Sequence, residues 1–278
     1  MNAEAPQFTP QLFQIIDLRL MELLRSLTAE EWEMQTIAKK WKVKDVAAHL
    51  LDGNIRALSL QRDKYFGQPG PADFEFKTVV DWINQFNNNW VNAAKRISPA
   101  VMILLHEATG KLTSEYFASL DPDERSIFPV DWAGEKESRN RLHVAREYTE
   151  KWLHQQQIRD AVQKPGIITK ELFYPFMNTF VVALPFTYKN IKAEDGTRVK
   201  ISIPDEAGGS WTIIHKDGAW QLLNDHAAEA DAELIIDADT AWKLFSRSLQ
   251  ASDVKSKVII NGNQELGETA LNMTSVMA

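Results

Sequence analysis

Apolar residues recur at every third or fourth position through most of the first 165 residues, and this spacing predicts amphipathic helices. The first helix is expected from Thr9 to about Leu27, with Thr9 as its N-cap and Pro10 in its first turn. The pattern predicts further helical segments at 43–65, at 77–120 with a restart at Ser98-Pro99, and at 138–162. Four main helices, one of them interrupted, indicate a helical bundle.

The pattern changes after Gly166, where short apolar or alternating runs predict β-strands. These runs lie at 198–204, 211–215, 220–223, 233–237 and 257–260. Lys216-Asp-Gly-Ala219 is typical of a hairpin turn, and helices are expected at 172–184, after a cap at Asp239 or Thr240, and at 265–277. The sequence therefore predicts two domains, a helical bundle at 1–165 and an α+β domain at 166–278.

Composition and charge narrow the function classes. A hydrophobic content of 44% with 25% charged residues is that of an ordinary soluble globular protein. The net charge of −7 and the lack of a basic cluster argue against a nucleic-acid partner. No export signal or long apolar run is found, so we expect no membrane partner and a cytoplasmic protein. The chain has no Cys, so any thiol chemistry must come from a small molecule.

One pair of residues indicates a metal site. Glu150 and His154 are four positions apart in the helix predicted at 138–162, so both side chains project from the same face. His49, in the second helical segment, is the best candidate for a third ligand. Two imidazoles and a carboxylate suit zinc or a similar divalent ion. The same spacing also occurs on solvated helix faces, where an acid merely lies beside a histidine.

Neighbouring residues on these helices have expected supporting roles. Asp45 and Asp52 lie within one turn of His49, and either carboxylate would be an acceptor for an imidazole N–H. His106 lies among leucines and alanine, which predicts a core histidine with a satisfied hydrogen bond. His215 and His226 lie beside turn-like residues in the second domain, and we assign no role to them.

Three segments of the bundle, 41–53, 128–135 and 145–161, resemble the N-terminal domain of the mycothiol-dependent maleylpyruvate isomerase family, within the DinB-like metalloenzyme superfamily. Segments 232–245 and 258–263 are similar to the sterol carrier protein-like domain that often follows it. The resemblance implies a DinB-like four-helix bundle followed by an α+β domain. It also implies zinc ligation, because His49, Glu150 and His154 match the family's ligand positions.

The resemblance further implies a metal-dependent enzyme that uses a low-molecular-weight thiol, mycothiol or an equivalent, as its cofactor. Its expected reaction is a thiol-dependent isomerisation or S-transfer on a small electrophilic substrate. Arg56 and Arg159 are the candidate catalytic residues, as clamps for an anionic group of substrate or thiol, although an arginine at either place is often only a surface ion-pair residue.

Two alternatives remain open on the sequence. In the first, the metal-bound species is water and the protein is a metal-dependent hydrolase. In the second, the metal is structural, the protein is not an enzyme, and the second domain carries a hydrophobic ligand.

Overall fold

The computed structural model describes residues 8–73, 75–127, 138–223 and 229–273. These residues form two compact units. One combines Pro10–Asp121 with Glu150–Ile167, and the other combines Pro122–Thr149 with Ile168–Val276. The long helix α6 (Asn140–Val162) thus supplies residues to both. The expected single boundary between residues 165 and 166 stays a prediction.

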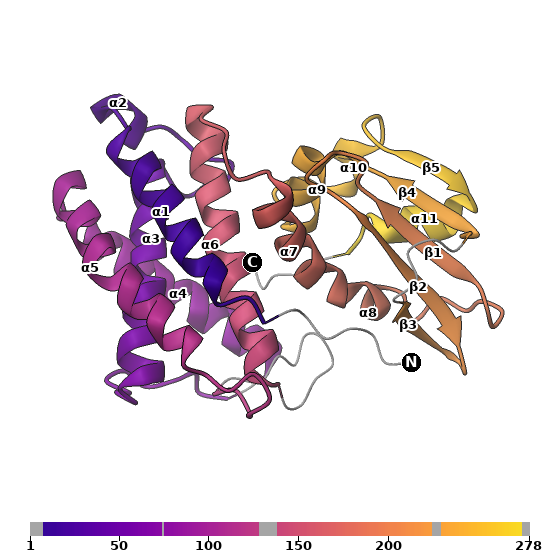
Figure 1. Ribbon diagram of the computed structural model, residues 1–278, viewed down its shortest axis with the longest axis horizontal. Helices are drawn as coiled ribbons and strands as arrows, with labels where there is room; N and C mark the ends of the chain where they lie inside the picture. Colours follow the sequence, from indigo (N-terminus) through magenta and orange to yellow (C-terminus); the bar gives the residue numbers. More distant parts are fainter. Residues whose placement is uncertain (1–7, 74, 128–137, 224–228, 274–278) are drawn as a thin grey trace. The chain divides into compact units, whose positions relative to one another are not determined.

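The first unit is a helical bundle (Figure 1). It contains α1 (Gln11–Arg25), α2 (Ala29–Trp32), α3 (Val43–Arg56), α4 (Phe76–Ala94), α5 (Pro99–Ala118) and the second part of α6. The interruption predicted at Ser98-Pro99 within 77–120 is confirmed, because it separates α4 from α5. Ser98 caps α5 by accepting a hydrogen bond from Val101 N at 3.3 Å, and Pro99 occupies the first turn.

Two other helix ends differ from the prediction. Thr9 does not cap α1, because Pro10 occupies the N-cap position without a side-chain hydrogen bond. The second predicted helix changes its winding after Arg56, where α3 continues as the π-helix η1 (Ala57–Arg62). The Asp63 N–H bonds to the carbonyl of Leu58, five residues earlier, as π winding requires.

The bundle is held together by apolar side chains from all of its long helices. Leu24 of α1, Leu51 of α3, Met102 of α5 and Ile158 of α6 are fully buried members of one cluster. Each such side chain contributes about 1.5–3 kcal/mol when it is fully removed from water. Because α3 and α6 both contribute to this core, their inward-facing side chains lie in the same bundle interior.

The second unit contains α7 (Lys170–Phe180), η3 (Val181–Ala183), α8 (Leu184–Thr187), α9 (Ala238–Phe245), α10 (Ala251–Val254), α11 (Gln264–Ala270) and a five-stranded sheet. The strands are β1 (Arg198–Ser202), β2 (Ser210–Lys216), β3 (Ala219–Leu223), β4 (Ala232–Ile235) and β5 (Ile259–Gly262). Their order is β3-β2-β1-β4-β5, with β1 and β4 parallel and the other pairs antiparallel. The predicted α plus α+β fold class is therefore confirmed.

Local features of this unit follow from identifiable residues. The predicted hairpin turn joins β2 to β3, with Asp217 and Gly218 both at positive φ, as a primed turn requires. The cap of α9 is Asp237, which accepts a hydrogen bond from Thr240 N, so the predicted cap at Asp239 or Thr240 is wrong. Segment 128–135 lies outside the described residues, as does His226. No described helix is long and apolar enough to cross a membrane.

Candidate metal centre

The side chains of His49, Glu150 and His154 meet in the bundle. Each offers a ligand atom, and the three atoms lie within 4.8 Å of one another. The part of the chain that the structure describes contains no other group of three such residues. His49 comes from α3, whereas Glu150 and His154 come from successive turns of α6. Residues that lie about 100 positions apart in the sequence are thus neighbours in the folded bundle.

His49 is in the state that metal binding requires. Its side chain is buried, and burial, followed by the charges on His154 and Arg56, lowers its pKa well below the ordinary histidine value. The imidazole is therefore neutral near pH 7, with one ring nitrogen bearing a lone pair. Its Nδ1 is buried and has no hydrogen-bond partner among the described residues. A bound cation or a ligand is the kind of partner that this polar atom lacks.

Each ring nitrogen of His154 faces a different side chain of α6. Its Nε2 lies 3.4 Å from Glu150 Oε2, and its Nδ1 lies 2.9 Å from Gln157 Oε1. The His154 ring stands edge-on to that of His49, with 4.6 Å between the ring centroids. Two imidazoles and one carboxylate form the donor set of a catalytic zinc site that keeps a further coordination position for water or substrate. The residues present therefore fit a zinc-like ion.

An indole ring covers this group. The Trp41 ring centroid lies 4.8 Å from that of His49 and 6.1 Å from that of His154. Its backbone carbonyl accepts hydrogen bonds from Thr36 N, Thr36 Oγ1 and Gln35 Nε2, which fold the segment before α3 into a tight loop. Trp41 is therefore held as an apolar wall beside the two imidazoles. The sequence places it near His49 but does not predict this contact with both rings.

The two aspartates expected to support His49 do something else. Asp45 caps α3 by accepting a hydrogen bond from Lys42 N at 3.0 Å. Asp52 is buried and forms an ion pair with Arg56, with 3.1 Å between Oδ2 and Nε. His49 bonds to neither of them, so this supporting role is wrong. Helical spacing places each aspartate within a turn of His49, but Asp45 bonds to the backbone of Lys42 and Asp52 pairs with Arg56.

The two candidate arginines have different surroundings. Arg56 is 35% exposed at its side chain, is anchored by Asp52, and lies over the Phe86 ring at 5.6 Å. Arg159 is buried and donates hydrogen bonds to the carbonyls of Arg19, Lys164 and Pro165, which fasten the end of α6. Arg56 thus keeps donors near the candidate site, whereas the Arg159 guanidinium is largely engaged by the backbone.

Other polar residues fix the bundle around the site. His106 is buried with its Nε2 2.9 Å from the Ala47 carbonyl, which confirms the predicted core histidine. Burial lowers its pKa to about 4. Lys151, which follows Glu150 in α6, forms an ion pair with Asp17 of α1. Gly110 lets Asp17 approach α5, since a Cβ at this position would lie 3.1 Å from Asp17 Oδ2.

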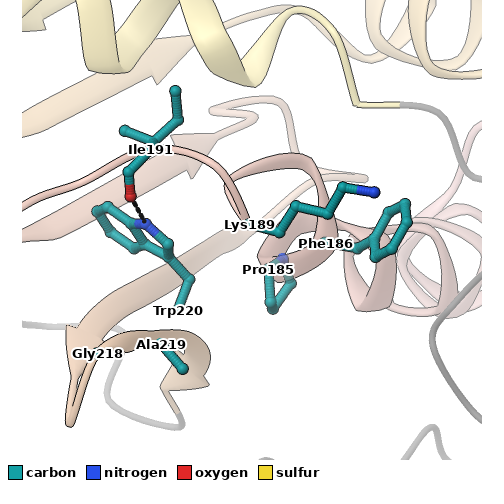
Figure 2. Close-up of a pocket in the computed structure, with 7 residues that line it drawn as sticks. All are labelled: Pro185, Phe186, Lys189, Ile191, Gly218, Ala219 and Trp220. Atoms are coloured by element: carbon teal, nitrogen blue, oxygen red, sulfur yellow. Dashed lines mark hydrogen bonds between the residues drawn. The ribbon is translucent and has the colours of Figure 1, made fainter.

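The second unit contains a separate, open cavity of about 280 Å³ (Figure 2). Trp220 forms one wall, with its Nε1 donating to the Ile191 carbonyl at 2.9 Å. Pro185, Phe186 and Lys189 line the opposite side, where the Lys189 ammonium lies 3.6 Å from the Phe186 ring centroid. No candidate site residue lies in this cavity.

Comparison with known proteins agrees with this architecture. The model of the mycothiol maleylpyruvate isomerase N-terminal domain matches residues 13–159, and the chain belongs to this family. The model of the SCP-2 sterol transfer family matches residues 187–273. The resemblance found in the sequence is thereby confirmed.

Solved structures show the same fold. Two crystal structures of mycothiol-dependent maleylpyruvate isomerase, one of them a point mutant, are each 9% identical to this chain. Each alignment covers 91% of both chains with a TM-score of 0.53. No curated protein sequence matches the chain.

Proposed function

We propose that this protein is a zinc-dependent enzyme that uses a low-molecular-weight thiol either to isomerise a small electrophilic substrate or to add the thiol's sulfur to it. The observation that carries the proposal is the convergence of His49, Glu150 and His154 on one point beside an apolar wall. Membership of a family named for a mycothiol-dependent isomerase supports the choice of a thiol over water. We further propose a cytoplasmic location, because the expected thiol and substrate are small intracellular metabolites.

In this proposal His49, Glu150 and His154 would hold the ion, and a bound ion would supply a thiolate nucleophile at neutral pH by lowering the pKa of a small thiol. His49 stays neutral because it is buried, so protons do not compete for it near pH 7. Trp41 excludes water from one side of the site. Arg56 binds a carboxylate of substrate or thiol, with its orientation fixed by Asp52. We keep Arg159 only as a second candidate for that task.

The first test is metal content. We expect protein purified without chelator to contain about one equivalent of zinc per chain by elemental analysis. The triple variant His49→Ala, Glu150→Ala, His154→Ala should contain none. A His106→Gln variant is the matched control, because this histidine is also buried in the bundle but lies outside the ligand group. Metal-free parent protein that stays metal-free after incubation with zinc would refute the proposal.

The second test separates the thiol-using enzyme from its two rivals. Maleylpyruvate and other small electrophiles are incubated with the zinc-loaded protein, with and without mycothiol or glutathione. Turnover that requires the thiol and disappears in the triple variant supports the proposal. Turnover without any thiol would favour the hydrolase. A hydrophobic ligand that copurifies with the protein and stays bound in the triple variant, without turnover, would favour the binding protein.

A further inference from the structure

The two ring nitrogens of His154 face different side chains of the same helix. Nε2 points toward Glu150, one turn earlier, and Nδ1 lies 2.9 Å from Gln157 Oε1, one turn later. Glu150, His154 and Gln157 therefore form a stripe along α6 at positions i, i+4 and i+7. The Glu150 side chain is 44% exposed, whereas Gln157 is buried. The stripe thus runs from the solvent-facing ligand to a buried carboxamide.

A carboxamide oxygen only accepts hydrogen bonds. Because Gln157 presents its Oε1 to His154 Nδ1, the proton of the neutral imidazole belongs on Nδ1, and the lone pair belongs on Nε2. The opposite tautomer would place a proton on Nε2, facing the Glu150 carboxylate at 3.4 Å. In that state Nε2 would carry a proton directed at Glu150 and would have no lone pair for an ion.

We propose that Gln157 is a positioning residue that holds His154 in the Nδ1–H tautomer and so aims its Nε2 lone pair at the point shared with His49 and Glu150. The inference deepens the proposed function and rests on it wherever metal affinity is concerned. Gln157 itself touches neither metal nor substrate. Its effect passes entirely through the ring of His154.

The choice of a carboxamide has an electrostatic reason. A buried carboxylate at this position would need a partner of its own, because an unpaired charge is costly to remove from water. It would also add a second negative charge one turn beyond His154. A carboxamide supplies the acceptor without that charge, so Glu150 remains the one anionic side chain among these three residues.

The neighbouring residue provides a matched control. Gln156 is 5% exposed against 6% for Gln157, and its Oε1 has no hydrogen-bond partner among the described residues. Replacing either glutamine by leucine removes the same buried group from the same helix at similar volume. Only Gln157→Leu removes the acceptor for His154. Gln157→Glu retains an acceptor oxygen, although it adds a charge, and serves as the rescue variant for the tautomer.

The first measurement uses metal-free protein, so it does not depend on zinc binding. Two-dimensional ¹H–¹⁵N NMR spectra that correlate ring nitrogens with carbon-bound protons identify the tautomer of His154. We expect Nδ1–H in the parent, in Gln156→Leu and in Gln157→Glu, and a shift toward Nε2–H in Gln157→Leu. An Nε2–H tautomer in the parent, or no change in Gln157→Leu, would overturn the inference.

The second measurement is the zinc dissociation constant, obtained by competition with a chromophoric chelator. We expect Gln157→Leu to bind zinc about 10- to 100-fold more weakly than the parent, and Gln156→Leu to stay close to the parent. Equal affinities in parent and Gln157→Leu would refute the role of Gln157 and leave the metal site intact. A parent that binds no zinc would refute the proposed function, while the NMR result would still decide the tautomer.

Discussion

Trp41 shields the candidate ligands from water. Its ring lies against both imidazoles, and burial is the largest cause of the low pKa of His49. In metal-free protein we therefore expect Trp41→Ala to raise the pKa of His49 toward the ordinary value of about 6.5. Trp41→Phe should keep most of the depression. An NMR pH titration of the histidine ring protons measures this, and an unchanged midpoint in Trp41→Ala would show that other groups bury His49.

His106 links the stability of the bundle to pH. Burial lowers its pKa to about 4, so between pH 6.5 and pH 4 the unfolded chain binds a proton that the folded chain does not. The stability that the folded protein gains from keeping His106 neutral is fully present above pH 6.5 and is lost as the pH falls from 6.5 to 4. At pH 5 the loss is about 2 kcal/mol relative to pH 7.

The variant His106→Gln tests this linkage, because its amide still reaches the Ala47 carbonyl but does not titrate. Urea unfolding of the parent and the variant at pH 7 and pH 5, in the presence of chelator, gives the two pH dependences. We expect the variant to lose about 2 kcal/mol less than the parent on going to pH 5. The same loss in both proteins would mean that His106 does not carry the effect.

At this scale the sequence was sufficient for His49, Glu150 and His154 as candidates, because helical spacing and the family motif both point to them. It did not reveal Gln157 or the contact of Trp41. The Gln157 carboxamide is the third of three consecutive glutamines, and only the direction of the His154 ring distinguishes it from the other two. The partner of an imidazole nitrogen depends on side-chain rotamers, which a residue pattern does not encode.

At the scale of elements, the end of α6 depends on a glycine. Gly166 has a φ of +150°, and a Cβ there would lie 2.9 Å from Arg159 Nη1, which is already bonded to two nearby carbonyls. We expect Gly166→Ala to destabilise the protein by about 1–3 kcal/mol through backbone strain and displacement of the guanidinium.

Gly53→Ala is the matched control for this prediction. Gly53 lies within α3, and a Cβ there would meet nothing within 4 Å apart from the adjacent residues and the backbone of its own helix. This substitution should stabilise the protein by about 0.5–1 kcal/mol, because alanine loses less backbone entropy in a helix. Urea unfolding midpoints compare the two variants, and a Gly166→Ala protein as stable as the parent would contradict the proposed strain.

Helices and strands were largely predictable because their apolar spacing is regular. Their ends were less so. Ser98 was recognised because serine before proline is a strong start signal, and the structure confirms its cap. Thr9 also precedes a proline, and Asp239 and Thr240 are common capping residues, but Pro10 and Asp237 occupy the two N-cap positions. Several candidate caps within a few residues compete, and packing of the helix decides between them.

For the whole molecule, ligand binding and stability are linked. If zinc binds only the folded chain, a free concentration 100 times the dissociation constant adds about 2.7 kcal/mol of stability. For a protein of this size we expect the thermal midpoint to rise by about 5–10 °C on zinc addition. The triple ligand variant should show no rise. An equal rise in that variant would mean that zinc acts elsewhere on the protein.

The π-helix η1 has a consequence for how the bundle tolerates change. A π turn closes with one residue more than an α turn, so this segment accommodates a surplus residue without a loop. The extra residue lies beyond the C-terminal end of α3, and therefore after His49 and Arg56 in the chain. A residue could therefore be inserted or deleted between Ala57 and Arg62 while the spacing between His49 and Arg56 stays fixed. Such a change in length would leave the candidate metal ligands where they are.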